Sequence, residues 1–77
     1  MKSVLVTGAS SGIGLACAVH LASRGWRVFG TSRRPPADPV PFTFVAMDVT
    51  SEASVADALA TILTEVGQLD AVVHSAG

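Results

Sequence analysis

The chain has 77 residues and a formal net charge of -1, and 49% of its residues are hydrophobic and 14% charged. This composition is typical of a soluble globular protein and argues against disordered and fibrous classes. A nearly neutral chain without a basic stripe argues against nucleic acid as a partner. The apolar run at residues 4–6 is far shorter than the roughly 20 residues of a membrane helix, so we expect no membrane partner.

Cys17 is the single cysteine of the chain. It has no partner for an internal disulfide, and no group of cysteine and histidine residues has the spacing of a metal site. We therefore expect no bound metal, a reducing compartment and a cytoplasmic location.

The first 31 residues predict a strand, a loop, a helix and a second strand. Residues 2–7 are rich in β-branched side chains without alternation, which is typical of a strand buried on both faces of a parallel sheet. Residues 13–24 predict a helix that stops at Gly25, and residues 27–31 predict the second strand. The apolar positions expected to face the core recur every four residues along this helix: Ile13, Cys17 and Leu21.

The second half of the chain predicts a strand over residues 42–49, a helix, and a strand over residues 69–73. Thr50 or Ser51 can cap the helix, and Gly67 ends it. Glu52 in the first turn suits the positive end of the helix dipole. The apolar stripe of this helix has the spacing of one helical face: Val55, Leu59, Ile62 and Val66.

Nine residues, 33–41, separate the second and third predicted strands, and four of them are proline. A crossover between parallel strands usually takes a dozen or more residues, so a full helix does not fit here. We expect an extended surface loop in place of a helix, which leaves one face of the sheet partly uncovered.

The segment T-G-A-S-S-G-I-G, residues 7–14, lies between the first predicted strand and the first predicted helix. Gly8 can make the turn off the strand, Gly12 can let a pyrophosphate approach the backbone, and Gly14 can let helix and strand pack closely. The backbone N–H groups of residues 11–13 would then face the anion. A flexible turn is the alternative, but the strand, loop and helix in this order favour dinucleotide binding.

Together with D-V-T at residues 48–50 and S-A-G at residues 75–77, this motif resembles the classical short-chain dehydrogenase/reductase family along the whole chain. The resemblance implies a Rossmann-type doubly wound parallel α/β sheet, here incomplete, with strand order 3-2-1-4. It also implies an oxidoreductase that uses a nicotinamide dinucleotide. His74 and Ser75 stand where the family has two asparagines, so the roles of those side chains are not carried over.

The resemblance further implies which residues hold the dinucleotide. The adenine would be bound by the Asp48 carboxylate and the Val49 backbone, and the ribose near the nicotinamide by Ala76 and Gly77. For Asp48, capping of the following helix is the alternative. The loop residues expected to lie against the phosphates are Gly8, Ser10, Ser11, Gly12, Ile13 and Gly14.

The end of the second predicted strand indicates which dinucleotide is preferred. An acid there binds the ribose hydroxyls of NAD(H), whereas a nearby arginine suits the 2′-phosphate of NADP(H). Residues 31–34 read Thr-Ser-Arg-Arg, without an acid. We expect NADP(H) rather than NAD(H), with Arg33 as the main contact. Ser10 and Ser32 are candidate hydroxyl partners and Arg34 is a weaker candidate; the alternative is that both arginines are solvated turn charges.

The catalytic tyrosine of the family, and the lysine four residues after it, have no counterpart in this sequence. It contains no tyrosine, and its only lysine is Lys2. We therefore assign no catalytic residue and expect the N-terminal part of one domain, truncated after the fourth strand. The complete protein is expected to be a homo-oligomer that acts on a small carbonyl compound or alcohol. The alternative is a non-catalytic dinucleotide-binding or interaction module, or an inactive remnant.

Overall fold

A computed structural model of the chain describes residues 1–75, so Ala76 and Gly77, both predicted to contact the cofactor, lie outside the described residues. Strands and helices follow one another in the predicted order. They are β1 (Ser3–Thr7), α1 (Gly12–Ser23), β2 (Arg27–Ser32), β3 (Thr43–Ala46), α2 (Glu52–Val66) and β4 (Ala71–His74). Within residues 1–75, neither helix has the length and hydropathy needed to cross a membrane.

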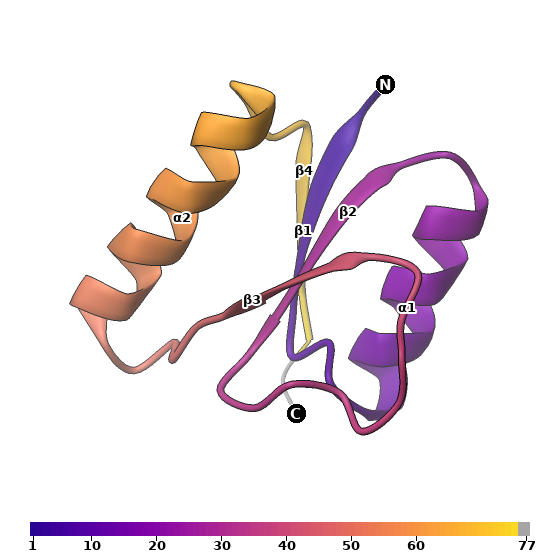
Figure 1. The fold of residues 1–77 in the computed structure, drawn as a ribbon, viewed down its shortest axis with the longest axis horizontal. Helices are drawn as coiled ribbons and strands as arrows, with labels where there is room; N and C mark the ends of the chain where they lie inside the picture. The colour runs from indigo at the N-terminus through magenta and orange to yellow at the C-terminus, as the bar shows by residue number, and fades with distance from the viewer. Residues whose placement is uncertain (76–77) are drawn as a thin grey trace.

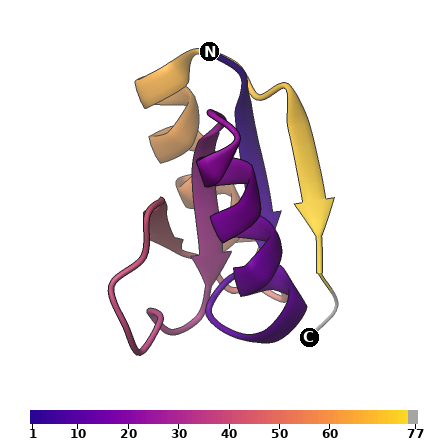
Figure 2. The same cartoon turned by 90° about the vertical axis from the view of Figure 1, so that its right-hand side faces the viewer.

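The strands form a parallel sheet in the order β3-β2-β1-β4, which confirms the predicted topology. α1 covers one face of the sheet and α2 the other (Figure 1 and Figure 2). β1 lies between two other strands, and all five of its residues are buried. Its β-branched and leucine side chains suit this position, which has a helix on either side. The carboxyl ends of the four strands therefore meet at one edge of the sheet.

Alternating side chains of the central strands build a separate apolar core on each face of the sheet. On the α2 face, Leu5 and Phe29 pack with Ile62 of the helix. Leu59 and Val66 pack against the same cluster, which confirms three of the four predicted stripe positions of α2; Val55 is half-buried and not part of the cluster. On the α1 face the buried cluster consists of small and β-branched residues: Val4, Val6, Ala9, Ala18 and Val28.

The side of α1 predicted to face the core is wrong at Ile13 and Cys17, whereas Leu21 packs against the core as predicted. Ile13 is 84% exposed and Cys17 only half-buried. Gly14 and Ala18 are the buried residues of the helix. Because α1 is apolar around most of its circumference, a four-residue spacing fits more than one face. The face with the smallest side chains lies on the sheet, since it allows the closest packing of helix on strand.

Both ends of α2 carry the expected signals. The Ser51 hydroxyl accepts a hydrogen bond from the Ser54 N–H at 3.2 Å, so Ser51 rather than Thr50 is the cap. At the other end Gly67 has a φ of 78°, and its N–H donates to the Leu63 carbonyl. This left-handed conformation explains why a glycine ends the helix.

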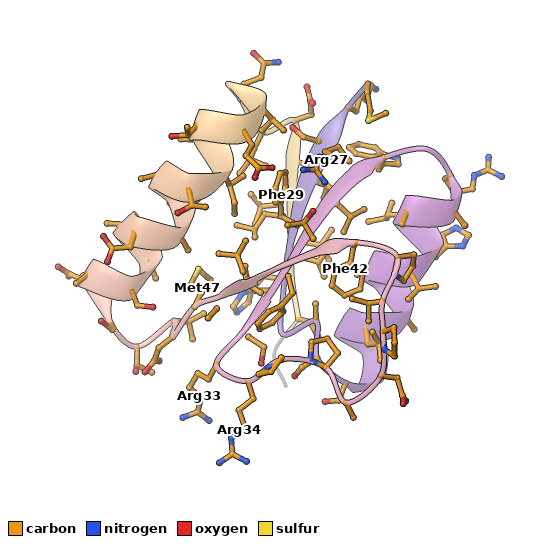
Figure 3. The ribbon with its side chains drawn as sticks, in the orientation of Figure 1. Arg27, Phe29, Arg33, Arg34, Phe42 and Met47 are labelled. Carbon is orange, nitrogen blue, oxygen red and sulfur yellow. The ribbon has the colours of Figure 1, made fainter. Side chains whose placement is uncertain are left out.

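The third strand is shorter than the predicted span of residues 42–49, and the connection before it is a loop as predicted. Residues 33–42 contain neither helix nor strand. Phe42 leaves the strand because its ring covers Gly30 of β2, where a Cβ would lie 2.2 Å from Phe42 Cε1. The ring packs against the core under α1 (Figure 3). Phe42 thus covers part of the face that a crossover helix would otherwise protect.

The fourth strand begins at Ala71, two residues later than the predicted start at residue 69, and ends at His74. Asp70 marks the entry, because its N–H donates to the Ser3 carbonyl at 2.9 Å. Its carboxylate accepts from the Ser3 N–H at 2.8 Å. Residue 70 is therefore held to the start of β1 by both its backbone and its side chain, and regular pairing begins after it.

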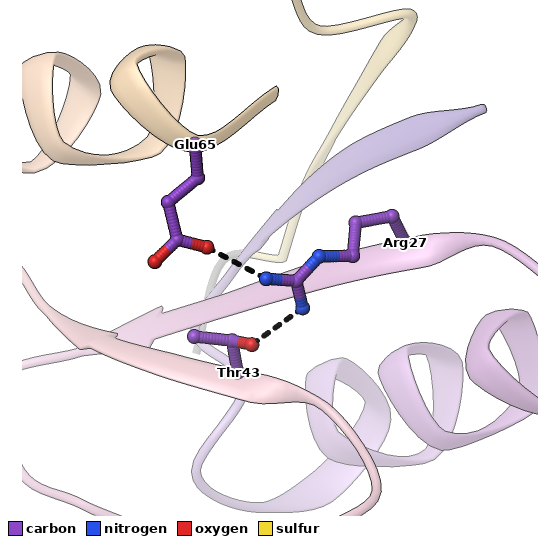
Figure 4. A network of polar contacts seen from close by, with 3 residues as sticks. All are labelled: Arg27, Thr43 and Glu65. Atoms are coloured by element: carbon purple, nitrogen blue, oxygen red, sulfur yellow. Dashed lines mark hydrogen bonds and ion pairs between the residues drawn. The ribbon is translucent and has the colours of Figure 1, made fainter. Parts of the chain in front are cut away.

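An ion pair joins three elements at the amino end of the sheet (Figure 4). Arg27 of β2 donates through Nη2 to Glu65 of α2 at 2.6 Å and through Nη1 to the Thr43 hydroxyl of β3 at 2.7 Å. The side chains of Arg27 and Glu65 are 37% and 48% exposed. Pairs this exposed contribute at most about 1 kcal/mol, so the contact orients the elements more than it stabilises them.

Ile62→Ala should lower the free energy of unfolding by about 3 kcal/mol, because it removes a fully buried side chain and leaves a cavity under α2. Denaturant unfolding measures the loss. Leu63→Ala in the same helix is the control; its side chain is 42% exposed, and the change should cost less than about 1 kcal/mol. Equal losses would contradict the assigned face of α2.

Candidate functional site

A cavity of about 430 Å³ lies at the carboxyl edge of the sheet. Thr7 lines it from β1, Thr31 from β2 and His74 from β4. Five residues predicted to hold a dinucleotide also line this cavity: Gly8, Ser32, Arg33, Asp48 and Val49. They are far apart in sequence, and the parallel topology brings them together because the carboxyl ends of the strands converge.

The loop between β1 and α1 depends on a close approach of two backbone segments. A Cβ on Gly14 would lie 2.0 Å from the Gly8 carbonyl oxygen, so a side chain does not fit there without moving the loop. Gly8 and Gly12 have φ values of 70° and 61°, which residues with a Cβ rarely adopt. The structure therefore confirms the turn at Gly8 and the close packing at Gly14.

The N-terminus of α1 is open to an approaching anion. Ser11 is the cap residue, but its side chain makes no capping hydrogen bond within the described chain. Ser11, Gly12 and Ile13 are exposed, and within residues 1–75 a Cβ on Gly12 would meet no atom closer than 4 Å apart from its chain neighbours and the backbone of its own helix. The first N–H groups of the helix thus remain available, and the helix dipole favours a negative group beside them.

Ser10 and Ser32 meet beside the end of β2, although they are 22 residues apart in sequence. The Ser10 hydroxyl donates to the Ser32 hydroxyl at 3.0 Å. Arg33 and Arg34 follow, and both side chains extend outward from this corner (Figure 3). Arg33 lines the cavity and Arg34 does not. The structure brings together the three residues predicted to surround a 2′-phosphate; their contact with a cofactor stays a prediction.

Asp48 presents a carboxylate to the cavity directly after β3. Its Oδ1 accepts hydrogen bonds from the Thr50 hydroxyl at 2.6 Å and from the Thr50 N–H at 2.9 Å. These bonds lower the pKa of Asp48 against the opposing effect of burial, and the charge of Arg33 lowers it further. Because Ser51 caps α2, the alternative role of Asp48 as the cap is not observed. Asp48 is therefore an ionised acceptor at neutral pH.

Thr7 joins the ends of β1 and β4, a role that we did not predict from the sequence. Its Oγ1 lies 2.8 Å from His74 Nδ1 and accepts a hydrogen bond from the Ser75 N–H at 3.3 Å. The parallel register pairs Thr7 with His74, so the strand order would have indicated this contact. The two residues that replace the asparagines of the family thus hold the end of β4 against β1.

The sheet order and the glycine-rich loop define a Rossmann-type α/β unit. The family whose sequence profile matches, over residues 2–77, is the short chain dehydrogenase family. The chain therefore belongs to the short-chain dehydrogenase family, whose members are oxidoreductases that use nicotinamide dinucleotides.

Similar proteins support this membership. The chain is 39% identical over 74 residues to 3-ketodihydrosphingosine reductase of Bacteroides thetaiotaomicron. This aligned region covers 96% of the chain and 28% of the reductase. It superposes with a TM-score of 0.91 and 34% identity on ligand-free aldohexose dehydrogenase of Thermoplasma acidophilum, covering 99% of the chain and 29% of the dehydrogenase. An actinorhodin polyketide ketoreductase variant with NADPH gives a TM-score of 0.84 and 30% identity, with 99% and 33% covered. The chain thus spans a third or less of the length of these proteins.

Gly14→Ala should destabilise the protein by about 3 kcal/mol, because the new Cβ would collide with the Gly8 carbonyl. The sign of this change in unfolding free energy is informative, because replacing glycine by alanine inside a helix ordinarily stabilises the helix by about 1 kcal/mol. Thermal and denaturant unfolding give the value. A stabilised variant would refute the close approach of helix and strand.

Thr50→Val should raise the pKa of Asp48, because it removes the hydroxyl bond and keeps the N–H bond. The folded protein holds this pKa below the ordinary 3.8, so the resulting stability is present above pH 3.8 and is lost as the pH falls through the folded pKa. Carboxyl-carbon NMR titration reports the shift. Thr64→Val on the exposed side of α2 is the control and should leave the pKa of Asp48 unchanged.

Proposed function

We propose that the protein is an NADP(H)-dependent oxidoreductase that interconverts a small carbonyl compound and the corresponding alcohol. The observation that carries the choice of cofactor is the corner at the end of β2, where Arg33 lines the cavity beside the Ser10–Ser32 pair. A guanidinium and two hydroxyls match a phosphate monoester both in charge and in hydrogen-bonding capacity. Arg33 would bind the 2′-phosphate that distinguishes NADP(H) from NAD(H).

The same corner offers little to a ribose without that phosphate. Residues 31–34 contain no acid that could accept from two ribose hydroxyls. Asp48 lines the same cavity, but it follows β3, and Thr50 already donates two hydrogen bonds to its Oδ1. NAD(H) is therefore the less favoured cofactor.

The remaining parts of the dinucleotide have fitting partners as well. Its pyrophosphate would lie at the N-terminus of α1, where Gly12 leaves open space and the first N–H groups are available. Its adenine amino group would donate to the ionised Asp48 carboxylate. Val49, which is 58% exposed, would lie beside the base. This arrangement supports the assignment of one extended ligand rather than of isolated anion sites.

The reaction class rests on the family and on the similar proteins. They are named as a keto-group reductase, a sugar dehydrogenase and a polyketide ketoreductase, and such names describe carbonyl–alcohol interconversion. When bound, the cofactor supplies or accepts the hydride. The residues of this chain bind and orient the cofactor. The sequence contains no tyrosine, and we assign no proton transfer to its residues.

Arg33→Asp should weaken NADPH binding by about 10–100-fold and leave NADH binding nearly unchanged, because a charge-assisted contact with the 2′-phosphate is replaced by repulsion. Calorimetric titration with both cofactors measures the two dissociation constants. Arg34→Asp makes the same charge change one residue further on, outside the cavity, and should have a much smaller effect on NADPH. Equal losses for NADPH and NADH in the Arg33 variant would refute the cofactor assignment.

A further inference from the structure

A row of side chains crosses the sheet at the edge of the cavity. The parallel register aligns Thr31 of β2 with Thr7 of β1 and Val45 of β3, and aligns Thr7 with His74 of β4. Strand partners in register point to the same face, and the preceding row on this face contains Phe29, which packs under α2. Thr31 therefore belongs to the end of the sheet where the cover by α2 gives way to the cavity.

The Thr31 hydroxyl differs from the other polar groups of this row. Thr7 Oγ1 has partners in His74 and in the Ser75 N–H. Thr31 is 0% exposed, and its Oγ1 is buried without a hydrogen-bond partner among residues 1–75. A buried hydroxyl without a partner destabilises a protein, and a valine of nearly the same shape would avoid this cost. Threonine rather than valine at the wall of this cavity is explained if a bound ligand supplies the missing hydrogen-bond partner.

The chemistry around Thr31 indicates what kind of ligand atom this would be. Asp48 lines the same cavity as an acceptor only, whereas a threonine hydroxyl can also donate. An adenine edge carries an amino donor next to a ring-nitrogen acceptor, so it matches a cavity whose wall offers both an acceptor and a donor. A guanine edge has two acceptors at the corresponding places, so it offers no donor to a carboxylate, which can only accept.

We propose that the Thr31 hydroxyl donates a hydrogen bond to a ring nitrogen of the adenine, next to the amino group bound by Asp48. This inference rests on the proposed function, because it concerns the adenine end of the same dinucleotide. The hydroxyl has almost no exposed surface, so a side chain beside it must shift to admit the base. Met47 lines the cavity from the side of α2 (Figure 3), and its unbranched side chain is flexible enough for this movement.

The test compares Thr31→Val with Thr31→Ser in calorimetric titrations with NADPH and NADH. Thr31→Val should raise both dissociation constants by about fivefold, because both cofactors carry the same adenine. Thr31→Ser keeps the hydroxyl and should stay within about twofold of the parent protein. The ligand-free Thr31→Val variant should melt at the same or a higher temperature, since it no longer buries a hydroxyl without a partner.

Thr43→Val is the matched control, because it makes the same change on the neighbouring strand at the opposite end of the sheet. Its hydroxyl accepts from Arg27, so the variant should melt at a lower temperature and bind both cofactors like the parent. Unchanged binding by Thr31→Val, equal loss in Thr31→Ser, or a lower melting temperature of ligand-free Thr31→Val would each overturn the role of Thr31. If the parent protein binds neither cofactor, the proposed function fails and the adenine contact fails with it.

Discussion

The contact between the backbones of Gly14 and Gly8 is the constraint on which the rest of the structure depends. A Cβ on Gly14 would lie 2.0 Å from the Gly8 carbonyl oxygen, so α1 can lie against the end of β1 only because that atom is missing. This contact fixes the direction in which α1 leaves the sheet. The open N-terminus of the helix is thereby held beside the carboxyl edge of β1 and β2, where the cavity lies. Moving the helix outward would separate its N-terminus, where the pyrophosphate is proposed to bind, from the cavity.

Parallel pairing supplies the second requirement of the site. Thr7, Thr31 and His74 are distant in sequence, yet the register places them in one row. The same convergence brings Asp48 to the cavity that Arg33 also lines, close enough for the arginine charge to help lower the pKa of the carboxyl. One cavity thus carries both a negative and a positive side chain, which suits a ligand with a polar base and a phosphate.

Much of this arrangement could be predicted from the sequence, and the failures have physical causes. The strand order was implied by the resemblance to the short-chain dehydrogenase/reductase family, whereas the loop in place of a helix followed from the short, proline-rich connection itself. The core side of α1 could not be predicted, because Ile13 and Ala18 are both apolar and only close packing on the sheet selects the smaller one. The start of the third strand was predicted one residue too early, because the Phe42 ring packs over Gly30 of β2, a contact that the neighbouring sequence does not reveal. Contacts such as Thr7 with His74 exist only once the strands are paired.

The exposure of Arg33 and Arg34 has a consequence for how such a protein can change over generations. Both side chains extend from the end of β2 and belong to neither apolar core. Substitutions there alter charge at the rim without removing a packed side chain, and such surface changes usually shift stability by only about 0.5 kcal/mol. Under the proposed role of Arg33, the preference for one dinucleotide over another can therefore change almost independently of folding. Gly14 and the buried strands leave much less room for substitution, because an added or lost side chain there disturbs the packing of the fold.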